Sequence, residues 1–95
     1  MKPVDERLKQ IAEHYGLESQ IDILQEECAE LIQAVSKYRR SGFDEDVPFC
    51  IVEEIADVEI MLSQIKYLLG CSESIENVKE KKIKRQLRRI DNENS

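Results

Sequence analysis

The sequence predicts an all-α fold: a single four-helix bundle-like domain over residues 1–95 that is completed by oligomerisation. Apolar residues recur at spacings of three and four along four stretches, which is the period of an amphipathic helix. Turn-forming residues are scarce, with three Gly and two Pro. A chain of this length buries only about 60–65 % of its unfolded surface, so its core is modest and self-association would stabilise it.

The first two predicted helices are delimited by glycine. Pro3, followed by acidic residues that complement the helix dipole, predicts a first helix that ends near Gly16. From Leu17 a long apolar stripe predicts a second helix of about 22 residues, which ends at Arg39-Arg40-Ser41-Gly42. The residues expected to form the inner faces of these helices are Leu8, Ile11, Ala12, Ile21, Leu24, Cys28, Leu31, Ile32, Val35 and Tyr38.

The third helix is expected to run from about Pro48 to Leu69, with Gly70 as its stop. Its predicted inner face consists of Ile51, Ile55, Val58, Leu62, Ile65 and Leu69. A second apolar set, on roughly the opposite side at 100° per residue, consists of Phe49, Ile60 and Tyr67. A helix that is apolar on two faces needs two partners, so we expect one face to be used in a dimer or a larger assembly.

The fourth helix is predicted to begin at Ser72, which would act as its N-cap. Its apolar stripe is the weakest of the four and consists of Ile75, Val78, Ile83, Leu87 and Ile90. The segment from Lys79 to Arg89 is strongly basic, in contrast to the acidic remainder of the chain.

Charge and hydropathy exclude several classes of function. The net charge of -6 argues against a general nucleic-acid binder. The N-terminal segment lacks the apolar core of a signal peptide, and no apolar run approaches the roughly 20 residues of a membrane span. The three cysteines, odd in number and without a close CxxC pair, predict buried free thiols. We therefore expect a cytoplasmic protein with neither a nucleic acid nor a membrane as its partner.

Two acidic motifs provide the strongest functional signal. They are Glu26-Glu27-Cys28-Ala29-Glu30 in the second predicted helix and Glu53-Glu54-Ile55-Ala56-Asp57 in the third. Each motif sets two carboxylates three residues apart, so a helix directs the pair to one side. Four carboxylates brought together in this way would form a site for a hard cation.

Helical projection divides each motif into an outward Glu and a pair that leans inward. Glu54 falls inside the apolar sector of its helix, with Asp57 at the edge of that sector. Glu27 borders the apolar stripe of the second helix, and Glu30 lies farther out. The outward residues, which would be solvated, are Glu26 and Glu53.

The four inward-leaning carboxylates need a counter-charge. Two carboxylates about 5 Å apart repel by about 3 kcal/mol at an effective dielectric near 20, and an unpartnered inward carboxylate costs several kcal/mol. The sequence offers a divalent cation or the Lys and Arg residues of the fourth helix. Ligation by oxygen alone suits Mg²⁺ or Mn²⁺ and disfavours Zn²⁺, which prefers His or Cys.

The two motifs resemble the signature of the MazG-like all-alpha nucleotide pyrophosphohydrolases, E-E-x-x-E followed by E-x-x-D on the next long helix. The resemblance spans roughly residues 17–69, with weaker support to residue 90. It implies that Glu27, Glu30, Glu54 and Asp57 hold Mg²⁺, which engages the phosphates of a nucleoside triphosphate. It also implies cleavage between the α and β phosphates, giving a monophosphate and pyrophosphate, and it suggests removal of unwanted nucleotides as the role.

Other residues receive roles from the same resemblance. Lys82-Ile83-Lys84-Arg85 is similar to a K-x-x-R element of some members, and some members carry a Lys at a place similar to that of Lys37. The candidates for phosphate contacts are Lys37, Lys79, Lys82 and Arg85, although a surface role is an equal alternative for each. The candidates for a base, or for orienting the attacking water, are Glu26 and Glu53. Members of this size commonly form dimers or tetramers, so we expect a homodimer or homotetramer.

A second hypothesis comes from another class of function. The chain would be a non-catalytic helical interaction module, or an inactive relative that binds nucleotide, whose carboxylates pair with Lys82, Arg85 or basic residues of a partner. The two hypotheses differ in their response to Mg²⁺, because only a metal site would make the folded protein more stable when the cation is added.

Overall fold

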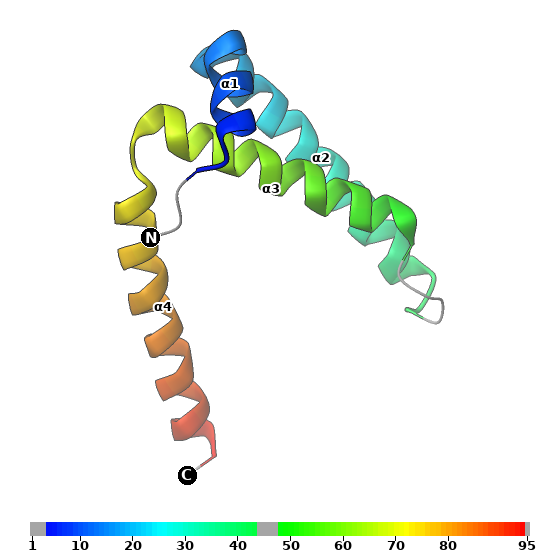
Figure 1. The fold of residues 1–95 in the computed structure, drawn as a ribbon. Helices are drawn as coiled ribbons and strands as arrows, with labels where there is room; N and C mark the ends of the chain where they lie inside the picture. The colour runs from blue at the N-terminus through cyan, green and yellow to red at the C-terminus, as the bar shows by residue number, and fades with distance from the viewer. Residues whose placement is uncertain (1–3, 44–47, 95) are drawn as a thin grey trace.

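Four α-helices form the chain in the computed structural model, which describes residues 4–43 and 48–94 (Figure 1). In chain order they are α1 (Glu6–Tyr15), α2 (Leu17–Arg40), α3 (Phe49–Leu69) and α4 (Ser72–Glu93). No strand occurs among the described residues, which confirms the all-α, four-helix prediction.

Glycines end two of the helices as the sequence predicts. Gly16, with φ of 85°, ends α1 and directly precedes α2, so the chain turns there without a spacer. Gly70 adopts the left-handed conformation at the end of α3, with φ of 62° and ψ of 33°. At the start of the chain, the Asp5 side chain caps α1 by accepting a hydrogen bond from the Arg7 backbone N–H at 2.9 Å.

Two predicted helix starts are shifted by one residue. Pro48 is the N-cap of α3 and lies outside its first turn, because its ψ of 143° is extended. The N-cap of α4 is Cys71, and Ser72 is the first helical residue, so the prediction that Ser72 caps this helix is wrong. No side-chain hydrogen bond caps α4, and its first intrahelical hydrogen bond runs from the backbone N–H of Ile75 to the Cys71 carbonyl at 3.0 Å.

Helices α2 and α3 form an antiparallel hairpin, and α1 lies against it near the N-terminal end of α2 (Figure 1). Gln64 on α3 donates a buried side-chain hydrogen bond to Gln20 on α2, which sets the register of the two helices. On the side of α1, the Tyr67 hydroxyl donates to the Glu13 carboxylate. The buried apolar core consists of Ala12, Ala34, Ile51, Val58, Met61 and Ile65.

The predicted inner face of α3 divides into a buried and an exposed row. Ile51, Val58 and Ile65 are buried as expected. The other three predicted core residues are exposed: Ile55 by 43 %, Leu62 by 42 % and Leu69 by 53 %. A single projection groups both rows together because they lie side by side on the helix, whereas α2 covers only one of them.

Helix α4 diverges from the other three and does not pack against them (Figure 1). None of its residues is buried, and its apolar positions Val78, Ile83, Leu87 and Ile90 are about half exposed. The sequence placed this helix in a four-helix bundle. Within one chain, the packed unit consists of α1, α2 and α3.

All three cysteines are free thiols, as predicted, but the expectation that they are buried is wrong, because Cys28 and Cys71 are half-buried and Cys50 is exposed. It lies in the first turn of α3, at the end of the hairpin. Within residues 4–43 and 48–94, no helix has both the length and the apolar character needed to cross a membrane.

Candidate metal centre

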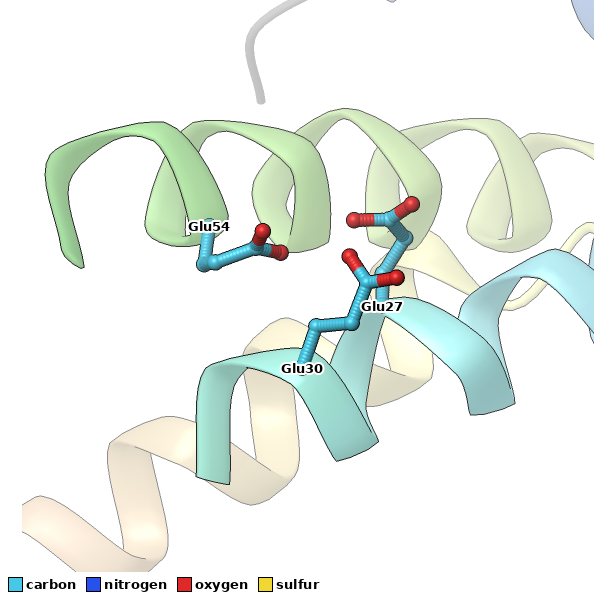
Figure 2. Close-up of side chains that lie close together, drawn as sticks. All are labelled: Glu27, Glu30 and Glu54. Carbon is cyan, nitrogen blue, oxygen red and sulfur yellow. The ribbon is translucent and has the colours of Figure 1, made fainter. Parts of the chain in front are cut away.

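The acidic centre is formed where the two motifs face each other across the α2–α3 hairpin. Glu27 and Glu30 lie one turn apart on α2, and Glu54 reaches toward them from α3 (Figure 2). Each of the three side chains offers one carboxylate oxygen, and these oxygens lie within 4.8 Å of one another. The antiparallel register that Gln20 and Gln64 establish therefore also brings the two motifs together.

Burial of this centre is uneven in a way that helical projection anticipated. Glu27 and Glu54 are half-buried, and Glu30 is exposed. One oxygen of each half-buried carboxylate, Oε2 of Glu27 and Oε2 of Glu54, is fully buried and has no hydrogen-bond partner. A buried acceptor without a donor is costly, so each of these two oxygens would be stabilised by a proton or a cation.

The burial and close approach of these carboxylates also raise pKa values at the centre. The pKa of the Glu27 carboxyl is raised to about 7, first by burial and then by the hydrogen bond with Glu54 and the charges of Glu30 and Asp57. The pKa of Glu54 is also raised, chiefly by burial. The carboxyls of Glu27 and Glu54 therefore bind a proton more readily than isolated glutamates do.

Asp57 lies at the edge of the centre. It is half-buried one turn after Glu54, and its charge acts on both Glu27 and Glu54, but it is not one of the three residues whose oxygens converge. The structure therefore brings together three of the four predicted metal ligands and places the fourth beside them.

The two outward glutamates of the motifs, Glu26 and Glu53, are exposed as projection indicates. Neither belongs to the group of converging carboxylates. Each neighbours a residue of the centre in the sequence, and each points to the solvent side of its helix.

The basic residues proposed for phosphate contacts lie in two different places. Lys37 is exposed on α2, about two turns beyond Glu30 on the same side of the helix. Lys79, Lys82 and Arg85 are on α4, which diverges from the hairpin, so this chain does not bring them to its own acidic centre. Lys79 instead pairs with Glu76, at 3.4 Å.

The basic surface of helix α4 includes more residues than the phosphate-contact candidates named from the sequence. A shallow basic hollow on this helix is lined by Lys81, Lys82, Lys84, Arg85 and Arg88. Three of these residues, Lys81, Lys84 and Arg88, were not singled out from the sequence. The signal that could have found them is the run from Lys79 to Arg89, which holds seven basic residues and one acidic residue.

None of the ion pairs among the described residues joins the acidic centre to a basic side chain. The pairs are local, linking Arg7 to Asp5, Lys9 to Glu6, Lys79 to Glu76 and Lys84 to Glu80. Pairing of the centre with Lys82 or Arg85 of the same chain, the intramolecular form of the second hypothesis, does not occur in this arrangement.

No family model, curated protein or solved structure matched this chain. The geometry of the centre and the motifs themselves are therefore the basis for proposing a function.

Proposed function

We propose that this chain is a Mg²⁺-dependent nucleoside triphosphate pyrophosphohydrolase of the MazG-like type, which cleaves between the α and β phosphates. The observation that carries the proposal is the convergence of Glu27, Glu30 and Glu54, which each place one carboxylate oxygen within 4.8 Å of the others, together with a buried oxygen without a partner on both Glu27 and Glu54. The motif resemblance is the basis for the proposed reaction. The buried oxygens without hydrogen-bond partners are the physical reason for proposing a bound cation.

The donor set fits a hard divalent cation. Every side chain at the centre offers carboxylate oxygen, and neither a Cys nor a His belongs to the group. Mg²⁺ favours such ligands, and Mn²⁺ accepts them. Glu27, Glu30 and Glu54 would hold the ion, with Asp57 completing the set. When bound, the ion would neutralise phosphate oxygens and lower the pKa of a coordinated water.

The remaining residues would act on the phosphates and the water. Lys37 projects to the side of α2 that carries Glu30, so we propose that its ammonium would contact a phosphate held near the centre. Glu26 and Glu53 are the candidates for accepting a proton or orienting the water. Lys79, Lys82 and Arg85 remain candidates for phosphate contacts. Because α4 diverges from the hairpin, they would reach the centre only from another copy of the chain or after a movement of α4.

Hydrolysis is tested by incubating the pure protein and Mg²⁺ with a panel of canonical and modified nucleoside triphosphates, and measuring the monophosphate and pyrophosphate released. Outer-shell partners of a metal contribute about 10–100-fold, so Glu54→Gln, which removes a ligand, should lower turnover at least about 100-fold. Asp22→Asn is the matched control, because Asp22 is an exposed carboxylate of α2 outside the centre. Absence of pyrophosphate from every substrate with folded protein would contradict the proposal.

Metal binding is tested separately by thermal unfolding. Mg²⁺ at about 100 times its Kd should add about 2.7 kcal/mol to the free energy of unfolding of the wild type. Glu54→Gln and Asp57→Asn should lose this response, and Asp22→Asn should keep it. Stabilisation by Mg²⁺ and nucleotide without turnover would identify a nucleotide-binding relative, and no stabilisation by Mg²⁺ would favour the interaction module.

A further inference from the structure

The basic and acidic residues of α4 lie on different sides of the helix. Projection at 100° per residue places six exposed basic side chains in one sector of about 160°, which we call the basic face. Its members are Lys81, Lys82, Lys84, Arg85, Arg88 and Arg89. Four of the five acidic residues of α4 lie in a separate sector of about 60° and are Glu73, Glu76, Glu80 and Asp91. A surface helix that only forms ion pairs within itself would intermix the two charges instead.

Most of the basic face has no acidic partner within the chain. Lys84 pairs with Glu80 at 3.7 Å, at the boundary between the two sectors. The other five residues of the face belong to none of the ion pairs among residues 4–43 and 48–94. All members except Arg89 line the basic hollow, so like charges gather around one space. A ligand with several negative charges would stabilise this arrangement.

The direction of α4 separates the basic face from the acidic part of the chain. Helix α4 leaves the end of α3 and extends away from the hairpin (Figure 1). Along the helix axis, Lys81 lies about 13 Å and Arg88 about 24 Å from Ser72. The Debye length at physiological ionic strength is about 8 Å, so salt screens most of the field of the acidic hairpin there. The expectation that nucleic acid is not a partner depends on the net charge of -6, whereas residues 79–89 alone carry +6.

We infer that the basic face of α4 binds the phosphate backbone of a nucleic acid. From Lys81 to Arg88 the face spans about 10 Å of helix axis, and a duplex carries one negative charge per about 1.7 Å of its axis. About six phosphate charges therefore lie along the face, which is close to its number of basic side chains. Helix α4 contains no aromatic residue that could stack on a base. The contacts are thus made to phosphates and carry no sequence preference.

The same arrangement disfavours an anionic membrane as the partner. A helix that lies on a membrane inserts its apolar side, and the basic residues that reach the headgroups lie beside that side. The exposed apolar row of α4 consists of Ile83, Leu87 and Ile90, and the centre of the basic face lies on the opposite side of the helix. Glu76 and Glu80 lie beside the apolar row, where anionic headgroups would repel them.

An acidic protein is also a poorer fit than a nucleic acid. The centre of a protein–protein interface is depleted of charged residues and enriched in aromatic residues. Within residues 79–90 the basic face contains no apolar side chain. A phosphate backbone requires only positive charge on its partner.

The test measures binding of the full chain to fluorescently labelled DNA by anisotropy, with a duplex of about 20 base pairs and a single strand of equal length as probes. A chelator is present, so a metal at the acidic centre does not contribute. Lys81→Gln/Arg88→Gln is compared with Arg39→Gln/Arg40→Gln, which removes two exposed arginines at the end of α2. The two variants have the same net charge, and circular dichroism reports whether each remains helical.

We expect the wild type to bind the duplex with a Kd that rises about 150–500-fold between about 50 and 200 mM salt, as four or five phosphate contacts require. At the lower salt concentration, Lys81→Gln/Arg88→Gln should weaken binding about tenfold or more and reduce the salt slope by about two. Arg39→Gln/Arg40→Gln should change the Kd by less than about threefold. Should the first variant lose helical structure, Lys84→Gln/Arg89→Gln takes its place.

Three results would overturn the inference. The first is folded wild type that binds neither probe at low salt. The second is an equal loss of binding in the α4 and α2 variants, which would indicate attraction by overall charge. The third is binding to phosphatidylserine vesicles but to neither probe, which would assign the basic face to a membrane. Hydrolysis of nucleoside triphosphates by Lys81→Gln/Arg88→Gln should equal that of the wild type, so this inference and the proposed function fail independently.

Discussion

At the scale of single residues, Glu27 couples the acidic centre to the stability of the fold. Its pKa of about 7 lies above the ordinary value of 4.5, so between these values the folded state binds more protons than the unfolded state. The free energy of unfolding contributed by this group therefore falls as pH rises from about 4.5 to about 7. Asp5, whose pKa Arg7 lowers to about 2, titrates outside this window.

Glu27→Gln should remove this pH dependence. In metal-free protein the variant should unfold at a temperature close to the wild type at pH 5. At pH 8 it should unfold about 4–8 °C higher, which corresponds to about 1 kcal/mol once solvent screening is allowed for. Thermal unfolding in a chelating buffer measures the difference, and Glu26→Gln is the exposed neighbouring control. If the unfolding temperatures of Glu27→Gln and the wild type differ by the same amount at both pH values, Glu27 is not the source of the pH dependence.

At the scale of helices, α4 is the element whose stability is predicted to differ most from the rest. None of its residues is buried, so its amides are protected only by its own helical hydrogen bonds and by weak local pairs such as Lys84 with Glu80. A helix without tertiary packing is marginal in water. Helices α2 and α3 share a core and should open only with most of the fold.

Amide hydrogen exchange followed by mass spectrometry should show this contrast directly. We expect protection below about 100-fold in residues 79–93, against about 1,000-fold or more in the buried parts of α2 and α3. The peptides of α3 serve as the internal reference. Protection of α4 equal to that of α3 would mean that α4 is packed in the protein in solution, either on its own chain or on another copy.

The helices also show what the sequence could and could not predict. Gly16 and Gly70 mark helix ends that local chemistry determines, and Glu27 and Glu54 were found because a carboxylate inside an apolar stripe is visible in projection. The buried pair Gln20 and Gln64 was missed, because a polar residue is assigned to solvent unless its partner is known. The exposed row of α3 and the divergence of α4 were missed for a related reason: projection gives a direction for each side chain but not the neighbour that lies there.

At the scale of the whole molecule, basic, acidic and apolar residues are concentrated in different parts of the surface. Helix α4 carries seven basic and five acidic residues, whereas the remainder of the chain carries seven basic and fifteen acidic residues. The acidic centre belongs to this negative part, and the exposed row of α3, Ile55, Leu62 and Leu69, is an apolar area elsewhere on the hairpin. Self-association through this exposed row would bury apolar surface and leave both the acidic centre and the basic α4 accessible.

An assembly of this kind makes thermal stability depend on protein concentration. Unfolding of a dimer separates two chains, so a tenfold rise in concentration adds about 1.4 kcal/mol to the free energy of unfolding. For two 95-residue chains this should raise the Tm by about 3–6 °C. Scanning calorimetry at about 10 and 100 µM protein measures the shift, with Ile60→Lys as a control that should behave as the wild type. Leu62→Lys should melt at a lower temperature that does not change with concentration, because its chains unfold singly. A wild-type Tm that is the same at both concentrations would show that the fold does not rely on a second copy, and the exposed row Ile55, Leu62 and Leu69 would then be a solvated surface of a monomer.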